Sequence, residues 1–353
     1  RGERMESLCE QHFPHSLGLL YSAFTYYLGF RVNSGEYKVM GLAPYGKPRF
    51  VELIFDKLLD CKADGSFRLD LRYFNYCTGL TMTSPAFDEL FGGPPRRPES
   101  KLEQKHLDMA ASIQKVTDEI MLRTVRHAHA LTKAKHLCLA GGVALNCVTN
   151  GKLLREGPFE NIWIQPAAGD AGGALGVAWL IWHTLLEQKR IPSAGDAQQG
   201  SLLGTEYDDE QIARVLNACG VVFKTVPEGK EIANHVAGLL AEQLVVGWFQ
   251  GRMEFGPRAL GARSILGDAR NAEMQRIMNQ KIKFRESFRP FAPAVLREHA
   301  HEWFDMAPNA DSPYMLIVAG VHPEKCLPVE EKVSGLERIR EKRSEIPAVT
   351  HVD

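Results

Sequence analysis

The sequence has no pair of cysteines in a CxxC spacing. Its seven cysteines are odd in number and scattered along the chain, so neither a disulfide framework nor a zinc knuckle is predicted. Isolated thiols of this kind are typical of proteins that stay reduced in the cytosol. We therefore expect a cytoplasmic protein with free cysteines, which are Cys9, Cys61, Cys77, Cys138, Cys147, Cys219 and Cys326.

An excess of charge of one sign is also missing. The 42 Lys and Arg residues nearly balance the 43 Asp and Glu residues, which leaves a net charge of −1. No overall field therefore attracts the chain to nucleic acid or to an anionic membrane. No apolar run approaches the roughly 20 residues that a membrane span requires. We expect neither nucleic acid nor membrane as a partner, and any basic site must be local.

The chain has enough hydrophobic residues to form two hydrophobic cores. The chain has 353 residues, of which 44% are hydrophobic, and this length fits two domains. Apolar residues at helical spacing predict a helix from Leu107 to about Leu131. Residues 136–142 and 161–170 are predicted strands, and residues 171–188 a buried helix of small residues. Strand, glycine turn, helix and strand in this order predict parallel crossover units and an α/β fold.

A segment without periodicity separates the two halves. Residues 189–206 are rich in Pro, Gly, Ser and Gln, which is typical of an exposed linker at a domain boundary. Beyond it, apolar spacing predicts helices around residues 212–219 and 232–240. Leu244–Phe249 is predicted to be a buried strand. The charged segment 332–345 is predicted to form a surface helix or loop.

A glycine pair follows the strand predicted at residues 136–140. Gly141 and Gly142 permit close approach of a ligand to the backbone, and Asn146 lies shortly after them. Nearby amides in such a loop can meet phosphate or ribose oxygens. A tight turn between strand and helix explains the same pattern, because a short glycine motif is a weak fingerprint.

Asp170 lies among small residues where a strand passes into a helix. A lone aspartate at such a place is commonly an N-cap, worth about 1 kcal/mol. The functional alternative is a metal ligand beside a nucleotide, because a carboxylate oxygen suits a hard cation. One carboxylate does not make a metal site by itself.

The segment GEYKVMGLAPYGKP, residues 35–48, places Glu36 and Lys38 before a turn rich in Gly and Pro. A salt-bridged strand end followed by a loop is a sufficient structural interpretation. No function is assigned to this segment from its residues alone.

The most unusual segment is basic. Between Arg252 and Arg297 there are ten Lys and Arg residues against four Asp and Glu residues. Arginine alternates there with Phe, Pro, Gly and Ala, in EFGPRALG and FRPFAP, unlike a solvated helix face. Guanidinium groups meet phosphate oxygens in bidentate fashion. The cost of burying unpaired charge favours a polyanion pocket, and a structural network of ion pairs is the alternative. The scarcity of interleaved aromatic residues lowers the nucleic-acid option.

Five segments of the chain occur in the order found in a known family. They are EYKVMGLAPYG, GGVALNCVTNGKL, PAAGDAGGALG, GWFQGRMEFGPRALGARSIL and NQKIKFRESFRPFAPAV. With them the chain, from about His15 to Asp353, resembles the NodU/CmcH-type O-carbamoyltransferases. The two arginine-rich segments are specific to that family, whereas the glycine segments are shared with actin-like ATPases.

The resemblance implies an architecture and a reaction. Residues 1–190 would form an actin-like ATPase (ASKHA) domain, similar to the tRNA threonylcarbamoyl-transferase subunit. Residues 191–205 would be a linker, and residues 206–353 a YrdC-like domain. The YrdC-like domain would make carbamoyl adenylate from carbamoyl phosphate and ATP, with Mg²⁺ accompanying the ATP. The other domain would transfer the carbamoyl group to a hydroxyl of a small-molecule acceptor with help from a divalent metal, iron in this family.

The resemblance also implies roles for individual residues. The catalytic group that binds carbamoyl phosphate and the ATP phosphates would be Arg258, Lys283 and Arg289. Residues that bind the nucleotide would be Gly141, Gly142, Asn146, Arg252 and Arg263. Asp170 would be a metal ligand.

Two other functions are considered. Carbamoylation of a protein thiol in hydrogenase maturation is disfavoured by the absence of CxxC motifs. A nucleotide-gated binding module in tRNA modification would need a broad basic surface, which the net charge of −1 does not favour.

The family's HxxxH metal ligands and the end of its YrdC-like domain are not found in the chain. We therefore expect an incomplete domain at each end and little activity from this chain alone. The acceptor and the oligomeric state are not specified by any motif.

Overall fold

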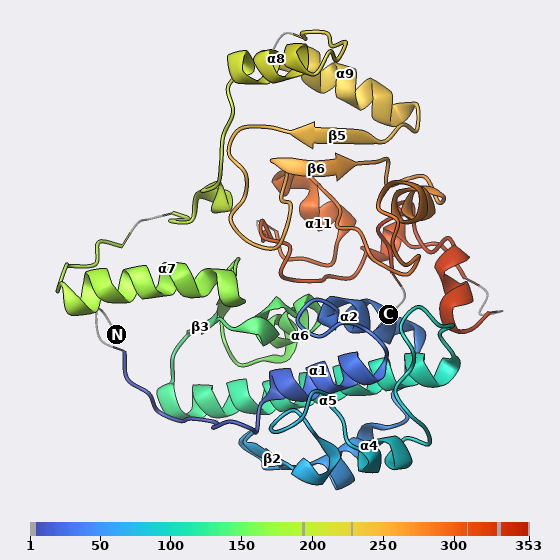
Figure 1. Ribbon diagram of the computed structural model, residues 1–353. Coiled ribbons are helices and arrows are strands. Elements are labelled where there is room, and N and C mark those ends of the chain that lie inside the picture. Colours follow the sequence, from blue (N-terminus) through green and yellow to red (C-terminus); the bar gives the residue numbers. More distant parts are fainter. Residues whose placement is uncertain (1–4, 193–194, 227–228, 309, 330–332, 352–353) are drawn as a thin grey trace.

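The computed structural model describes all residues except 1–4, 193–194, 227–228, 309, 330–332 and 352–353. The first half of the chain, from blue to green, lies below the second half, from yellow to red (Figure 1). The α-helices are α1 (Leu17–Tyr27), α2 (Glu36–Leu42), α3 (Val51–Leu53), α4 (Pro85–Leu90), α5 (Gln104–Thr132), α6 (Cys147–Glu156), α7 (Asp170–Leu180), α8 (Asp209–Ala218), α9 (Lys230–Ala241), α10 (Met274–Arg276) and α11 (Ala300–Trp303). The strands are β1 (Leu59–Cys61), β2 (Phe67–Leu69), β3 (His136–Leu139), β4 (Asn161–Ile164), β5 (Val246–Phe249) and β6 (Arg263–Leu266).

Shorter 3₁₀ and π turns connect these elements. They are η1 (Ala43–Tyr45), η2 (Ile54–Leu58), η3 (Leu71–Tyr73), η4 (Gly142–Leu145), η5 (Ile181–Leu185), η6 (Gln199–Ser201), η7 (Ile277–Ile282), η8 (Arg297–His299), η9 (Pro323–Lys325) and η10 (Gly335–Arg340). The segment predicted as a surface helix or loop at residues 332–345 thus contains the 3₁₀ turn η10.

Helix α5 organises the core of the first half. Met109, Ile113, Val116 and Ile120 recur along one face and are at most 1% exposed. This face packs against α1, α2 and the turn η1. The helix ends where Lys133 adopts a left-handed conformation with φ of 51°, a common way to terminate a helix. The helix predicted from apolar spacing is confirmed.

Strands β3 and β4 pair in parallel, with α6 as the crossover between them. The register pairs His136 with Asn161 and Leu139 with Ile164. The backbone N–H of Gln165 donates to the carbonyl of Leu139 at 3.0 Å, just beyond the paired residues. The predicted parallel crossover unit is confirmed, and the first half is of the α/β type.

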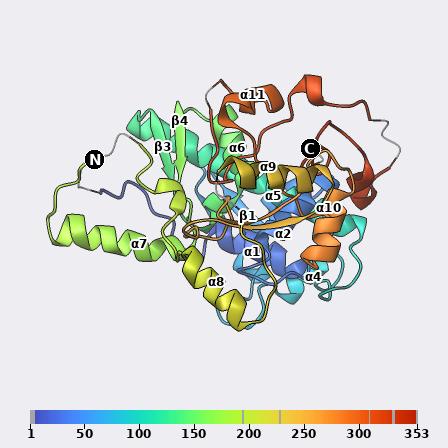
Figure 2. The ribbon, with the colours of Figure 1, turned by 90° about the horizontal axis from the view of Figure 1, so that it is seen from above.

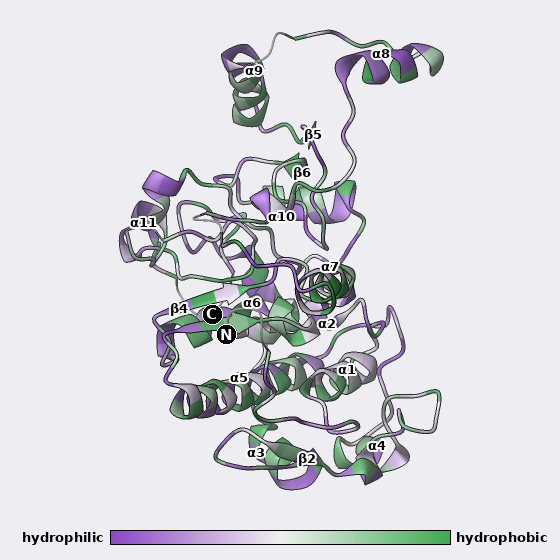
Figure 3. Cartoon of the chain, turned by 90° about the vertical axis from the view of Figure 1, so that its left-hand side faces the viewer, coloured by the Kyte–Doolittle hydropathy of each residue, from purple (hydrophilic) through white to green (hydrophobic). Residues whose placement is uncertain are grey.

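Helix α7 forms where a helix was predicted, but the expectation that it is buried is wrong. None of its residues is buried, and it lies at the periphery of the molecule (Figures 1 and 2). Its sequence is nevertheless apolar around most of its circumference (Figure 3). The exposed apolar residues of α7 and the following turn are Val177, Trp179, Leu180, Ile181, Trp182 and Leu185. No helix within the described ranges is both long and apolar enough to cross a lipid bilayer.

The second half contains less regular structure. Strands β5 and β6 pair antiparallel, with Val246 opposite Leu266. The strand predicted at Leu244–Phe249 forms as β5, but the expectation that it is buried is wrong, because all four residues of β5 keep part of their surface exposed. Helices α8 and α9 form as predicted, yet contain no buried residue, and they project from the body of the molecule (Figure 3).

The linker between the halves is only partly exposed, which corrects the sequence expectation. Ser201 is fully buried and Gln198 nearly so. The Tyr314 hydroxyl donates to the Asp196 carboxylate and accepts from the backbone N–H of Gly200. The side chain of Tyr314, which is distant in sequence, thus attaches the linker to the second half.

The two halves share hydrophobic cores. Tyr314 and Leu316 of the second half are buried with Ala144, Ile164 and Ala168 of the first half. The buried Asn150 side chain on α6 donates to the carbonyl of Leu316 at 3.0 Å. These contacts place residues 140–146 between β3 and α6, which we call the glycine loop, directly against the second half.

Candidate functional site

The glycine pair lies in an open loop between β3 and α6. Gly141 has a φ of 94° and a ψ of 163°, a combination that favours glycine. Its N–H donates to the carbonyl of Ala168 at 2.9 Å. A β-carbon placed on Gly141 or Gly142 would meet no atom within 4 Å. Backbone conformation, and not crowding by protein atoms, therefore explains Gly141, and space beside the loop is open.

Asn146 caps helix α6, and its side-chain oxygen accepts from the backbone N–H of Thr149 at 3.1 Å. A buried polar network fixes this side chain. Asn146 donates to the Gln114 carbonyl oxygen at 3.0 Å, and the Gln114 amide donates to Asp118 at 3.0 Å. The hydroxyl of Tyr21 also donates to Gln114, at 3.1 Å. Asn146 is thus held by α1 and α5 as well as by its own helix.

Arg258 of the second half reaches the glycine loop. Its Nη2 donates to the carbonyl of Leu145 at 3.1 Å. Its Nη1 is buried and has no hydrogen-bond partner among the described residues. Burial lowers the pKa of Arg258, whereas the nearby Cys147 acts in the opposite direction. A buried N–H group of a cation without a partner is costly, and an anionic ligand would satisfy it.

The loop that carries Arg258 is built around the buried carboxylate of Glu254. The backbone N–H groups of Leu260 and Ala262 each donate to its Oε1 at 2.7 Å. Burial alone would raise the pKa of Glu254, but these N–H groups and then Arg263 lower it below its ordinary value. Gly256 has a φ of 127° where the loop passes against Ala167 of the first half. The loop is therefore a preformed support for Arg258.

The arginines predicted to bind the nucleotide have different surroundings. Arg263 pairs with Glu254 at 3.0 Å and donates to the carbonyls of Glu254, Gly256 and Arg258. Its guanidinium is occupied in holding the loop. Arg252 donates to the carbonyl of Gly204 at 3.2 Å and lies 3.4 Å from Glu206, so it joins the loop to the linker.

A second basic group lies in the segment after η7, which we call the basic loop and define as residues 283–290. It carries Lys283, Arg285 and Arg289, of which sequence reasoning missed Arg285. The fully buried Asn279 organises this loop. Its amide donates to the carbonyl of Arg289 at 2.9 Å, and its oxygen accepts from Arg285 at 2.6 Å.

The cations of the basic loop repel each other. Loss of solvent contact, and then the charges of Arg285 and Arg289, lower the pKa of Lys283. Burial, and then the charge of Arg289, lower the pKa of Arg285 to about 10. Within the described part of the chain, neither Lys283 nor Arg285 forms an ion pair with a carboxylate. Of the three cations, Arg289 forms an ion pair with Glu286, and the excess of positive charge in the basic loop favours a bound anion.

Both basic groups adjoin neighbouring elements of the first half. Arg258 lies at the start of α6, whereas Arg289 lies 4.4 Å from the ring centroid of Tyr37 on α2. Helices α2 and α6 meet at Met40 and Cys147, whose sulfur atoms are 3.8 Å apart. The structure therefore brings the glycine loop, Arg258 and Arg289 to neighbouring elements of the first half.

The interpretation of residues 35–48 as a strand end with a local salt bridge is wrong. The segment starts with helix α2, and the partner of Lys38 is Glu286 of the basic loop at 2.5 Å. Glu36 instead accepts from the hydroxyl of Ser22 at 2.8 Å. A partner 248 residues away cannot be recognised from local spacing.

Asp170 is exposed in the first turn of α7, and the N-cap of that helix is Gly169. Among the residues that the structure describes, no three His, Cys, Asp or Glu side chains are grouped so that they could hold a metal ion. The described residues thus contain no complete set of metal ligands, and the expectation of a metal ligand at Asp170 stays a prediction.

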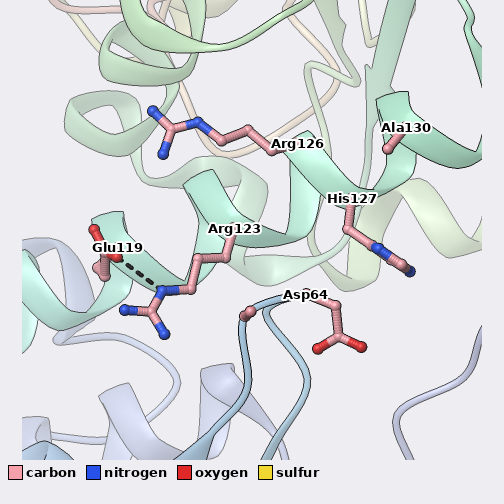
Figure 4. A pocket seen from close by; sticks show the side chains of 7 residues that line it. Asp64, Glu119, Arg123, Arg126, His127 and Ala130 are labelled. Atoms are coloured by element: carbon pink, nitrogen blue, oxygen red, sulfur yellow. Dashed lines mark hydrogen bonds and ion pairs between the residues drawn. The ribbon is translucent and has the colours of Figure 1, made fainter.

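An open hollow lies elsewhere, along the outer side of α5 (Figure 4). Asp64, Arg123, Arg126 and His127 contribute to its lining, and Arg123 is paired with Glu119 at 2.8 Å. None of the residues predicted from the sequence lines this hollow. The side chains that line this hollow are partly or fully exposed, so we do not place the functional site there.

Comparison with known proteins identifies both halves. Residues 2–179 match the family model described as carbamoyltransferase N-terminus, and residues 237–353 match the one described as carbamoyltransferase C-terminus. An uncharacterised protein of Synechocystis sp. is 56% identical over 100% of this chain and 58% of its own length.

Two nodulation proteins are also similar. Nodulation protein NolO of Bradyrhizobium diazoefficiens is 39% identical over 97% of this chain and 57% of its own length. Nodulation protein NolNO of Sinorhizobium fredii is 38% identical over 97% of this chain and 46% of its own length. The chain spans about half the length of the curated relatives it matches. From the matches to both halves, the chain belongs to the carbamoyltransferase family.

Proposed function

We propose that the chain provides the carbamoyl-activating site of an O-carbamoyltransferase, which uses carbamoyl phosphate and ATP. The product of activation is carbamoyl adenylate, and the final acceptor is a hydroxyl group of a small molecule. The observation that carries the proposal is the pair of basic groups around α2 and α6. Arg258 has a buried N–H without a partner among the described residues, and the basic loop carries three cations that lower one another's pKa values or pair with Glu286.

The proposed chemistry brings two anionic substrates together. Water cleaves the phosphate from carbamoyl phosphate, which releases inorganic phosphate and carbamate. A carbamate oxygen then attacks the α-phosphorus of ATP, and pyrophosphate leaves. The acceptor hydroxyl finally attacks the carbamoyl carbon, loses its proton to solvent and displaces AMP. Fixed cations offset the repulsion between the substrates and stabilise the charge on the leaving pyrophosphate.

Each basic residue has a proposed role in this sequence. Lys283 and Arg289 bind the phosphate groups, and Arg285 increases the positive potential beside them. Arg258 holds a phosphate oxygen next to the glycine loop. Gly141 and Asn146 face the nucleoside of the adenylate. ATP would be accompanied by Mg²⁺, and no step here is assigned to a metal at Asp170.

The test is pyrophosphate release from ATP that depends on carbamoyl phosphate. We expect release by the wild-type protein and a loss of about 100-fold or more in Lys283→Ala and Arg289→Ala, because each removes a charge that stabilises the transition state. Lys281→Ala is the matched control, since Lys281 is an exposed lysine of the neighbouring turn η7. An unchanged rate in Lys283→Ala, or release that is independent of carbamoyl phosphate, would contradict the proposal.

A further inference from the structure

Helix α2 of the first half contacts the basic loop of the second half, although the proposed reaction assigns it no role. We propose that Tyr37 and Lys38 are positioning residues, which hold the basic loop in the orientation that presents Lys283 and Arg289 to phosphate. The link of this role to catalysis rests on the proposed function. The positioning itself depends only on contacts within this chain.

The first contact is an ion pair. The Lys38 Nζ atom lies 2.5 Å from Oε1 of Glu286, and both side chains are less than a quarter exposed. Glu286 also faces Arg289, with 3.7 Å between its Oε2 and Nη1. Burial would raise the pKa of Glu286, but the hydrogen bond from Lys38 and the charges of Lys38 and Arg289 lower it. The carboxylate thus stays ionised and connects α2 to Arg289.

The second contact is a stack. The guanidinium of Arg289 lies 4.4 Å from the centroid of the Tyr37 ring. A planar guanidinium gains both cation–π attraction and defined orientation from an aromatic face. Arg289 is therefore held between a ring and a carboxylate, and no further side-chain hydrogen bond occupies its guanidinium among the residues that the structure describes.

The third contact is close packing of side chains of the basic loop against the first half. Phe288 is 2% exposed and belongs to the core of the first half. A β-carbon on Gly41 would lie 3.3 Å from Cδ of Pro290. Glycine within a helix costs about 1 kcal/mol relative to alanine, and close approach to the basic loop explains its presence in α2.

These contacts distinguish α2 from an ordinary surface helix. Lys38 neutralises Glu286, so that the carboxylate does not cancel the charges that would bind phosphate. Removal of Lys38 would leave Glu286 free to attract Arg289 away from a ligand. The expected consequence is weaker anion binding and greater mobility of the basic loop, without general unfolding.

The experiment measures hydrogen exchange of residues 283–290 and the affinity for pyrophosphate by calorimetry. We expect Lys38→Met to speed exchange in this segment and to weaken pyrophosphate binding about tenfold, a typical coupling between sites. The conservative variant Lys38→Arg, which keeps the positive charge beside Glu286, should keep most of the affinity. Tyr37→Phe, which keeps the ring, should bind as wild type, whereas Tyr37→Ser should bind more weakly.

The control is Lys62→Met, because Lys62 forms an exposed pair with Asp60 at 2.6 Å in the same half. It should leave exchange and affinity unchanged. Wild-type exchange and affinity in Lys38→Met, or affinity as low in Lys38→Arg as in Lys38→Met, would overturn the inference. A protein that shows the expected shifts but releases no pyrophosphate would refute the proposed function and support the positioning role.

Discussion

Arg258 lies in the loop before β6 and Arg263 is the first residue of that strand, yet the two have opposite electrostatic surroundings. Arg263 is paired with the buried Glu254, whereas Nη1 of Arg258 is buried without a partner among the described residues. A protein retains an unpaired buried cation at a cost to stability. We infer that Arg263 stabilises the loop and that Arg258 serves a ligand.

This difference predicts opposite effects of the same substitution. Arg258→Met should leave the free energy of unfolding unchanged or raise it by about 1 kcal/mol, because an uncompensated charge is removed. Arg263→Met should lower it by about 2 kcal/mol, because Glu254 loses its ion pair. Thermal unfolding monitored by circular dichroism measures both. Equal destabilisation by the two substitutions would show that Arg258 is also structural.

Asp268 provides a test of pH dependence. A hydrogen bond from Arg270 is the main cause that lowers the pKa of Asp268 to about 2. A carboxylate with a lowered pKa adds stability above its unfolded pKa of about 3.9, and this contribution is lost as the pH falls towards 2. Arg270 is largely exposed, so we expect a contribution on the order of 1 kcal/mol.

The substitution Asp268→Asn should therefore lower the melting temperature at pH 7. Its difference from the wild type should shrink between about pH 4 and pH 2 and vanish below that range, since both proteins are then neutral at this position. A difference independent of pH would mean that Asp268 acts through packing and not through its charge.

At the scale of the element, α7 forms the helix that its sequence predicts, although none of its residues is buried. Its small and apolar residues form a regular helix, but Val177 is 56% exposed and Leu185 in the following turn is 74% exposed. A helix that is apolar on all sides is ordinarily covered by other structure, and large exposed apolar patches promote association.

We expect the double variant Val177→Gln with Leu185→Gln to reduce binding of a hydrophobic dye to this chain. Its melting temperature should stay within about 1 °C of the wild type, because exposed side chains contribute little to stability. Fluorescence titration and calorimetry measure the two quantities. A large fall in melting temperature would show that these side chains are buried in solution.

At the scale of the whole molecule, the two halves are joined by side chains in each other's cores. Phe288 of the second half is packed with Phe30 of the first, with ring centroids 6.5 Å apart. Leu336 and Ile339 also pack against the core of the first half. The second half has a small core of its own around Met274 and Met278. We infer that the halves unfold as one cooperative unit.

Phe288→Ala tests this inference. Loss of a buried phenylalanine costs about 3–5 kcal/mol, and here it should also separate one calorimetric transition into two. The less stable transition should belong to the second half. Two transitions already present in the wild type would contradict cooperative unfolding.

Part of the candidate site could be predicted from the sequence. The arginine-rich segment and the glycine pair were found because composition and short spacing are local properties. Arg285 lies in the same arginine-rich part of the chain, so its local composition could also have identified it. Asn279 was missed, and Lys38 was given a local partner in place of Glu286, because these contacts with the basic loop follow no local pattern.

The sequence by itself determined the elements whose residues interact along the chain, such as helix α5, the parallel crossover between β3 and β4, and the local excess of positive charge. The tertiary structure decided which of these elements are covered and which charges are paired. It left α7 exposed, placed Arg258 against the glycine loop and paired Lys38 with Glu286. Periodicity depends on residues a few positions apart, whereas burial and ion pairing depend on segments separated by up to 248 residues.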